Sequence, residues 1–375
     1  MIPPKELIEL IRNDDWKAVN RQLDEGMSVD VVMSMDNESL PCTPLQQAAG
    51  FGALRVIEGL IERGANLDYC KHYGSPLYCA VSFDRVHAAR FLLERGSDPN
   101  VPGPSEIEGD GRWTPLLKAV FRKNLEIVEL LLQFGAEPRS VSRKGIGVVT
   151  CAAYNEDEHL VAKFVAAGAP VSGNALLCAV ERENENLVQV LLGAKADPNY
   201  VAGKVELSNA VAGETPLSLA IKRLSISKSM KDTRTAMGRE KGQEECLRKI
   251  IGDLLRSGAD PSKQVHNRTP LSLAVLDRDV AIVRLLLASG ADVSGKTYSP
   301  FVEYKDSSGD ELGFYETALH SAVKNGDREV VAELLKAGAD PMARDHSGVS
   351  VIELIRQSAD REMTALFEQR SNARR

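Results

Sequence analysis

The chain has 375 residues, of which 26% are charged and 5% are aromatic, and its net charge is −7. This acidic excess argues against general affinity for nucleic acid. The sequence has no run of about 18 apolar residues and no apolar leader, so we expect no membrane association and a cytoplasmic or other intracellular location, the nucleus included. The six cysteines show no CxxC spacing, which predicts reduced thiols and no metal site.

One pattern returns along the chain, and its clearest copy runs from Thr114 to Pro138. It opens with Thr-Pro-Leu, continues with a small residue and a Leu-Leu pair, and reaches Gly135 21 residues after Thr114. A threonine hydroxyl caps a helix, proline suits the first helical turn, and glycine takes the left-handed conformation that ends a helix. The pattern therefore predicts a helix, a tight turn, a second helix and a stop.

The spacing predicts ten such units, counting one cap at each end. They open at Lys5, Thr43, Ser75, Thr114, Gly147, Asn174, Thr215, Thr269, Thr317 and Ser350. Seven glycines stand 21 residues after an opening, namely Gly26, Gly64, Gly96, Gly135, Gly168, Gly290 and Gly338. In the unit that opens at Asn174, Lys195 occupies this position instead.

Six of the openings read TPLQQA, SPLYCA, TPLLKA, TPLSLA (twice) and TALHSA. They resemble the T-P-L-H-x-A signature of the ankyrin repeat, which recurs about every 33 residues. The resemblance covers nearly the whole chain and implies an all-α solenoid of paired antiparallel helices with short β-hairpin fingers. We therefore expect residues 1–375 to form a single ankyrin-repeat solenoid in which each unit packs only on its neighbours.

The units differ in regularity along the chain. Residues 5–30 are polar enough to form an N-terminal cap, and the next three units are regular. The unit at Gly147 is degenerate because Val148 replaces the proline. The connection at residues 168–174 is too short for a finger, which predicts a weak joint between the two halves.

Two insertions interrupt the second half of the chain. Residues 224–245 separate the two helices of one unit and are poor in apolar residues, so we expect a loop on the surface. The second insertion, residues 294–316, holds five of the 19 aromatic residues: Tyr298, Phe301, Tyr304, Phe314 and Tyr315. We expect it to pack back on the last repeats, and the alternative is that it presents a second contact surface.

The sequence contains no recognisable catalytic, nucleotide-binding or metal-binding motif. It predicts no catalytic residues, no cofactor and no metal. Cys151 and His159 share one repeat and could form a dyad, but we favour the simpler interpretation of a small helix-face residue and a solvated loop histidine. His320 stands at the histidine of the signature, where the resemblance implies a structural hydrogen bond between loops.

The resemblance also implies that first helices and fingers line a concave face. Helical spacing predicts that the variable residue of the signature, and the residues three and four beyond it, share one exposed side. Aromatic residues fill these positions in the first four inner units, and basic residues prevail from the third to the sixth. The predicted partner-binding residues are Phe51, Phe83, Trp113, Lys118, Phe121, Arg122, Tyr154, Arg182, Lys222 and Arg223.

These observations favour a non-catalytic protein–protein interaction scaffold that binds a partner peptide or domain of acidic and apolar character in its concave groove. An alternative for the aromatic residues is that they pack on one another as part of the core. An alternative for the whole chain is an enzyme or small-ligand-binding protein with a site assembled from the groove and the long loops. The oligomeric state is left open.

Overall fold

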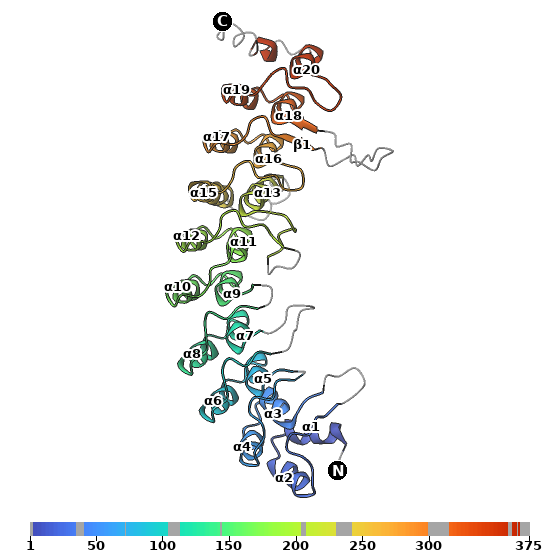
Figure 1. Ribbon diagram of the computed structural model, residues 1–375, viewed down its shortest axis with the longest axis vertical. Coiled ribbons are helices and arrows are strands. Elements are labelled where there is room, and N and C mark those ends of the chain that lie inside the picture. Colours follow the sequence, from blue (N-terminus) through green and yellow to red (C-terminus); the bar gives the residue numbers. More distant parts are fainter. Residues whose placement is uncertain are drawn as a thin grey trace. The chain divides into compact units, whose positions relative to one another are not determined.

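The computed structural model describes residues 3–34, 41–71, 73–103, 113–142, 145–203, 208–229, 242–298, 315–358, 362–365 and 367. Most regular structure in these residues is α-helical. The chain divides into two compact units, Met1–Ala175 and Leu176–Arg375. Each unit is a stack of helix pairs (Figure 1).

In the first unit, each repeat contributes two helices that pack on each other and on the next pair. The first helices are α1 (Pro4–Arg12), α3 (Pro44–Phe51), α5 (Pro76–Ser82), α7 (Pro115–Phe121) and α9 (Val148–Tyr154). The second helices are α2 (Trp16–Asp24), α4 (Leu54–Glu62), α6 (Val86–Glu94), α8 (Leu125–Gln133) and α10 (Glu158–Ala166).

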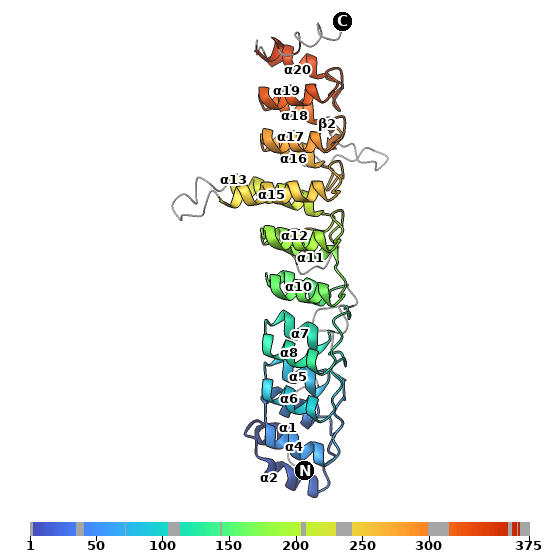
Figure 2. The same ribbon diagram turned by 90° about the vertical axis from the view of Figure 1, so that its left-hand side faces the viewer.

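The second unit repeats this arrangement. Its first helices are α11 (Gly173–Glu181), which begins in the last residues of the first unit, α13 (Pro216–Ser229), α16 (Pro270–Leu276), α18 (Ala318–Lys324) and α20 (Val351–Ser358). Its second helices are α12 (Glu185–Gly193), α15 (Gly242–Arg256), α17 (Val280–Ala288) and α19 (Arg328–Lys336). Figure 2 shows that α13 and α15 extend beyond the other helices of this unit.

The helices begin where the sequence offers a cap. The hydroxyl oxygens of Thr43, Ser75 and Thr114 accept the backbone N–H three residues later, at 3.2, 3.1 and 3.3 Å. A proline follows each of them at the first helical position, where an N–H would have no helical partner. Several second helices begin with an Asp or Asn cap, such as Asp157, whose Oδ1 accepts the N–H of Leu160 at 2.9 Å.

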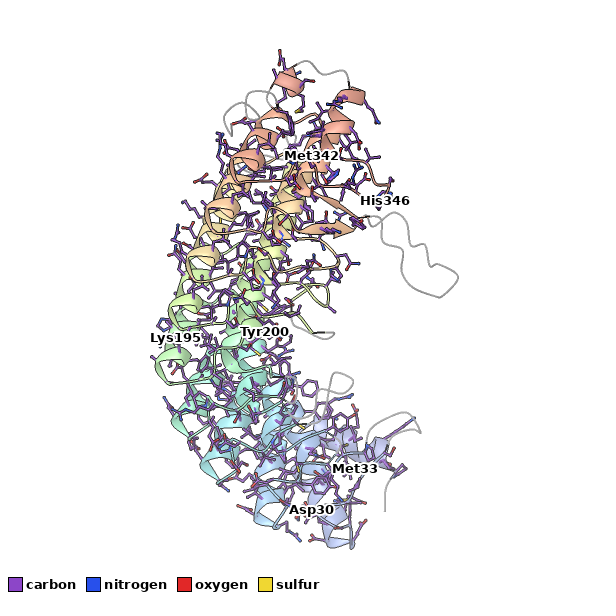
Figure 3. All side chains as sticks on the ribbon, turned by 45° about the horizontal axis from the view of Figure 1, so that its top comes forward. Asp30, Met33, Lys195, Tyr200, Met342 and His346 are labelled. Carbon is purple, nitrogen blue, oxygen red and sulfur yellow. The ribbon has the colours of Figure 1, made fainter. Side chains whose placement is uncertain are left out.

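The second helices end at a residue with left-handed backbone. At Gly135 φ is +86°, a conformation that glycine adopts without a steric penalty. Lys195 takes the corresponding position after α12 with a φ of 63°, which costs about 1 kcal/mol in a residue with a Cβ. Lys195 lies on the α12 side of its repeat and Tyr200 on the α11 side (Figure 3).

Side chains in the turns after the second helices connect consecutive repeats by accepting a backbone N–H of the next turn. In the first unit, these bonds join Asp30 (labelled in Figure 3) to Asn66, Asp68 to Asp98, and Asn100 to Glu137, at 3.1, 3.1 and 2.8 Å. In the second unit, they join Asn199 to Asp260 and Ser262 to Asp292, at 2.7 and 2.8 Å. The backbone of one repeat is therefore satisfied by its neighbour.

Apolar side chains of both helix layers form the core of each unit. Buried leucine, isoleucine, valine and alanine make up most of it, and the large side chains of Tyr78 and Phe164 are fully buried. In the first unit, the indole of Trp16 packs directly on Gly59 of α4, where a Cβ would collide with the ring. Tyr78 packs in the same way on Gly103. Both glycines are therefore sites of close packing.

Short antiparallel pairings form the expected fingers. Isolated bridges join Met33 to Cys42, Val141 to Gly147, Val265 to Arg268, and Arg344 to Ser350. In the second insertion, β1 (Lys296–Tyr298) pairs with β2 (Tyr315–Thr317). The next finger is attached to this ribbon, because His346, labelled in Figure 3, donates its backbone N–H to the carbonyl of Tyr315 at 3.0 Å.

The described residues test the expected packing of the aromatic insertion only at its ends. The Nζ of Lys296 lies 4.0 Å from the ring centroid of Tyr315. Residues 299–314 and the side chain of Tyr298 lie outside the described residues, so the packing of this loop stays a prediction.

The first insertion is helical at both ends, so the expectation of a loop from residue 224 to residue 245 is wrong there. Helix α13 continues to Ser229, and α15 already begins at Gly242. The two helices pack on each other, and Leu224 is buried between the layers. The few apolar residues of this segment are sufficient for helix formation, because they only lengthen a helix pair that already exists. Residues 230–241 lie outside the described residues.

Asp279 holds this lengthened pair to the next repeat. Its carboxylate caps α17, accepts a hydrogen bond from Arg248 of α15 at 2.9 Å, and forms an ion pair with Lys228 of α13. Its side chain is only 5% exposed. Burial raises the pKa of Asp279, but the hydrogen bonds from Arg248 and Lys228 outweigh burial, and the pKa is lowered overall.

The fold expected from the sequence is confirmed: paired helices in repeats, with short fingers between them. Among the described residues, no helix is both long enough and apolar enough to cross a membrane. The boundary at Ala175 lies next to the short connection at residues 168–174. Separate unfolding of the two halves stays a prediction.

We expect Gly59→Ala to destabilise the first unit by about 1–3 kcal/mol, because the new methyl group displaces the rigid indole of Trp16. Replacing a helical glycine by alanine ordinarily stabilises a protein. Gly193→Ala is the matched control, since a Cβ there meets no atom within 4 Å. Urea unfolding followed by tryptophan fluorescence and by circular dichroism measures both changes; equal stabilisation by the two substitutions would contradict the packing.

We expect Asp279→Asn to destabilise the second unit by about 2–4 kcal/mol at neutral pH, because Arg248 and Lys228 lose their charged partner. Asparagine keeps the helix cap. Since the folded-state pKa is lowered, the contribution of Asp279 is complete above the pKa of an unfolded carboxyl group and is lost as the pH falls through the folded value. The gap between wild type and variant in urea midpoint should therefore shrink from about pH 6 to about pH 3; a gap independent of pH would reject the ion pairs.

Candidate functional site

The predicted partner-binding residues lie in both units. Phe51, Phe83, Trp113, Lys118, Phe121, Arg122 and Tyr154 belong to the first unit, and Arg182, Lys222 and Arg223 belong to the second. All ten lie on or next to first helices.

The expectation of a three-residue exposed face on each first helix is wrong for the variable position of the signature in five units. Cys79, Cys151, Cys178, Leu219 and Ser321 occupy this position and are at most 6% exposed. These side chains are buried because the first helices of neighbouring repeats pack on each other. The outward positions are those three and four residues further on, and they lie at the carboxyl ends of the first helices.

Three predicted aromatic residues form one contact row in the first unit. The rings of Trp113 and Phe121 meet edge to face, with centroids 5.1 Å apart, and Phe121 stacks on Tyr154 at 5.7 Å with an angle of 19°. Trp113 is 5% exposed, whereas Phe121 and Tyr154 are half-buried. These contacts favour the core alternative for Trp113, and the other two rings expose one side each.

Phe51 and Phe83 line a separate cleft of about 400 Å³ in the same unit. Phe83 is 56% exposed and forms one wall. The floor is Gly50, where an added Cβ would lie 3.3 Å from the ring of Phe83. Cys42 and Cys79 complete an apolar lining, so the cleft is wide enough for one large side chain and has walls that such a side chain prefers.

Sequence reasoning missed the residues that shape this cleft. Tyr73 of the finger and Arg85 of the following turn both line it, and neither occupies a position predicted to be exposed. The Nε of Arg85 donates to the carbonyl of Gly50 at 3.1 Å, which leaves its terminal nitrogens at the rim. Arg85 forms no ion pair with any residue that the structure describes. A signal was available in Gly50, since a glycine inside a helix marks a close approach.

Arg12 of α1 contacts Phe51, one of the residues that line the cleft. Its guanidinium carbon lies 5.0 Å from the ring centroid of Phe51, within the range of a cation–π contact. Arg12 also pairs with Glu9 at 3.1 Å on the exposed surface, an interaction of small energy. Phe51 is therefore half-buried beneath Arg12.

Three of the predicted basic residues are paired with carboxylates, so the expected positive strip is partly neutralised. Arg122 binds Asp84 of the preceding repeat through Nε at 2.9 Å, and this hydrogen bond lowers the pKa of Asp84. In the second unit, Lys222 binds Glu214 at 2.8 Å and Arg223 binds Glu183 at 2.8 Å.

The remaining two predicted basic residues differ in exposure. Lys118 is half-buried on α7, and Arg182 is exposed after α11.

The histidine and cysteine candidates have structural environments. Cys151 is fully buried, so its thiol cannot meet a substrate, and His159 is exposed on another helix. His320 is buried; its Nδ1 accepts from the Thr317 N–H, and its Nε2 faces the carbonyl of Val349 at 3.3 Å. Burial lowers the pKa of His320. The expected bond between loops is confirmed.

Gln46 performs the same task in the first inner repeat. Its Oε1 accepts the N–H of Thr43 at 2.8 Å, and its Nε2 donates to the carbonyl of Gly74 at 2.6 Å. The signature position therefore accepts either an amide or an imidazole, because both combine an acceptor for the cap with a donor for the next finger.

Comparison with known proteins gives one family. A model described as "Ankyrin repeats (3 copies)" matches residues 7–102 and 236–345, and one described as "Ankyrin repeats (many copies)" matches residues 77–132.

Similar curated proteins include "Ankyrin repeat and KH domain-containing protein mask-1" of Caenorhabditis elegans, 24% identical over 68% of this chain and 11% of that protein. "Ankyrin repeat and SOCS box protein 9" of Mus musculus is 36% identical over 28% of this chain and 33% of its own length. "L-asparaginase" of Dirofilaria immitis is 31% identical over 40% of this chain and 26% of its own length. The chain thus spans at most a third of the length of these three relatives.

We expect the two kinds of aromatic residue to respond differently to truncation. Phe121→Ala removes both ring contacts of the row and should lower the free energy of unfolding by about 1–3 kcal/mol. Phe83→Ala removes a largely exposed ring and should change it by less than about 1 kcal/mol. Urea unfolding monitored by fluorescence measures both. A larger loss for Phe83→Ala than for Phe121→Ala would overturn the distinction.

Proposed function

Because this chain belongs to the ankyrin repeat family, we propose that it is a non-catalytic scaffold that binds a segment of a partner protein at the carboxyl ends of its first helices. Ankyrin repeats are protein-interaction modules, and the exposed positions of this chain carry the residue types enriched at interface hot spots. The single observation that supports the proposal most is the apolar cleft of the first unit.

The cleft suits one large apolar side chain of the partner. Its volume of about 400 Å³ accommodates a phenylalanine, leucine or methionine side chain together with adjacent backbone. Phe83 presents a rigid surface whose entropy of ordering is low, and burying it on binding removes an apolar ring from water. Most of the binding free energy would come from this contact.

The rim favours a negative charge next to that apolar residue. Arg85 forms no ion pair with a described residue, and the adjacent acid in the sequence, Asp84, is already bound by Arg122. A carboxylate of the partner would therefore find a cation whose charge is not yet neutralised. Such a contact sets the orientation and the rate of encounter more than the affinity.

Selection of peptides from a random display library on the full-length protein tests the proposal. We expect enriched peptides to combine one bulky apolar residue with neighbouring Asp or Glu. Phe83→Ala should weaken their binding about 5- to 150-fold, equivalent to about 1–3 kcal/mol, with an unchanged helical signal. Arg85→Glu should slow association and reduce its salt dependence.

Phe134→Ala provides the matched control, because Phe134 is a partly exposed aromatic residue of the same unit that does not line the cleft. Binding to this variant should equal that of wild type. Selected peptides that bind the Phe83 and Phe134 variants equally well would place the site elsewhere, and the proposal for the cleft would fail.

A further inference from the structure

A second pocket lies in the second unit, between α13 and α16 and the turns that precede them. Its volume is about 270 Å³, and its lining is polar and charged on one side and apolar on the other. It shares no residue with the aromatic cleft. Of its lining residues, the predicted partner-binding set contains only Lys222, because the charged residues of the pocket come from separate segments of the chain.

In the one ion pair that the described residues of this pocket form, the carboxylate is more buried than the cation. The side chain of Glu214 is 4% exposed, whereas that of its partner Lys222 is 48% exposed. Glu214 also accepts the backbone N–H of Val211 at 2.8 Å, which fixes its position. A charge removed from water gains more from a counter-ion than one that keeps its hydration.

Asp277 is the carboxylate of this pocket that lacks a counter-ion. It accepts the hydroxyl of Ser225 at 2.6 Å, and it forms no ion pair with a described residue. Burial raises the pKa of Asp277, and the hydrogen bond from Ser225 offsets this effect only in part. The two nearby cations, Lys228 and Arg268, act on it from beyond ion-pair distance.

The position of Asp277 at the end of α16 makes its negative charge more costly. The residue is the C-cap of that helix, where backbone carbonyls already present partial negative charge. The corresponding residue is basic in three other repeats, namely Arg122, Arg182 and Arg223. A cation bound at Asp277 would supply the positive charge that those arginines supply in the other three repeats.

The apolar side of the pocket is formed by Leu273 and Leu276. Leu276 is 43% exposed, so it offers a surface that water contacts in the free protein. Lysine and arginine carry a methylene stem behind their charge, and such stems lie along apolar surface.

We propose that this pocket binds a lysine or arginine side chain of a partner protein, with the cation on Asp277 and the stem along Leu273 and Leu276. The inference rests on the proposed scaffold function only for the source of the cation. The preference of the pocket for a cation is a property of this chain alone, and small amides can test it without a partner.

The opposing possibility is an anion held by Lys222 and Arg268. Lys222 is already bound to Glu214 and is 48% exposed, so an anion would gain less there, and it would also meet two carboxylates. The comparison of a basic with an acidic probe therefore decides between the two.

The experiment follows the methyl resonances of Leu273 and Leu276 in the full-length protein during titration with N-acetyl-lysine amide and N-acetyl-arginine amide. We expect both to shift these methyl groups with millimolar affinity, and N-acetyl-norleucine amide and N-acetyl-glutamate amide to bind at least about tenfold more weakly, equivalent to about 1.4 kcal/mol. Asp277→Asn should weaken the lysine amide by a similar factor. Glu329→Gln, which removes a 61% exposed carboxylate of α19, is the matched control and should bind like wild type.

Tighter binding of the glutamate amide, or equal binding by the Asp277 and Glu329 variants, overturns the inference. No shift with either basic amide overturns it as well. If Asp277→Asn does not fold, the four amides on wild type still decide the preference. If the amides do not bind as expected but peptide binding still depends on Phe83, only the inference about this pocket is rejected. If the lysine amide binds as expected but the Phe83 effect is lost, only the proposal for the cleft is rejected.

Discussion

Each repeat of this chain is too small to bury its own apolar surface, and that constraint governs the rest of the structure. Two short helices leave a leucine- and valine-rich face that only a neighbouring pair can cover. The turns obey the same dependence, because Asp30, Asp68 and Asn100 each accept a backbone N–H from the following repeat. The surfaces between repeats are therefore used for packing within the stack. Residues at the carboxyl ends of the first helices, such as Phe83, stay exposed.

The elements of the fold could be predicted because their signals are local. A cap, a proline and a terminal glycine lie within one repeat, and they mark helix boundaries whatever the neighbours are. The interpretation failed where a position depends on the next repeat. Cys151 and Cys178 were expected to be exposed, yet both are buried. The ends of the first insertion were expected to be a loop because its polar composition does not show that two helices continue side by side.

The candidate site could be predicted only in part, for the same reason. The aromatic residues were identified from helical spacing, but their division into a packed row and an open cleft depends on contacts between repeats. The ion pairs were invisible as well, since Arg122 and Asp84 lie 38 positions apart, and Arg223 and Glu183 lie 40 apart. A list of the basic residues on one face overstates the positive charge of that face, because it leaves out the acidic residues of the neighbouring repeats. Arg85 matters more to the cleft than the arginines that the pattern singled out.

The lengthened pair α13 and α15 shows how a repeat array can change without losing its register. The additional residues extend along the helix axes, and Asp279 fastens both helices to the next repeat through Lys228 and Arg248. The lengthened pair still packs on α12 of the preceding repeat and on α16 of the next one. Mutations that change the length or sequence at the far end of this pair therefore need no compensating change in the rest of the stack. New sequence can accumulate there during evolution while the surfaces between repeats stay the same.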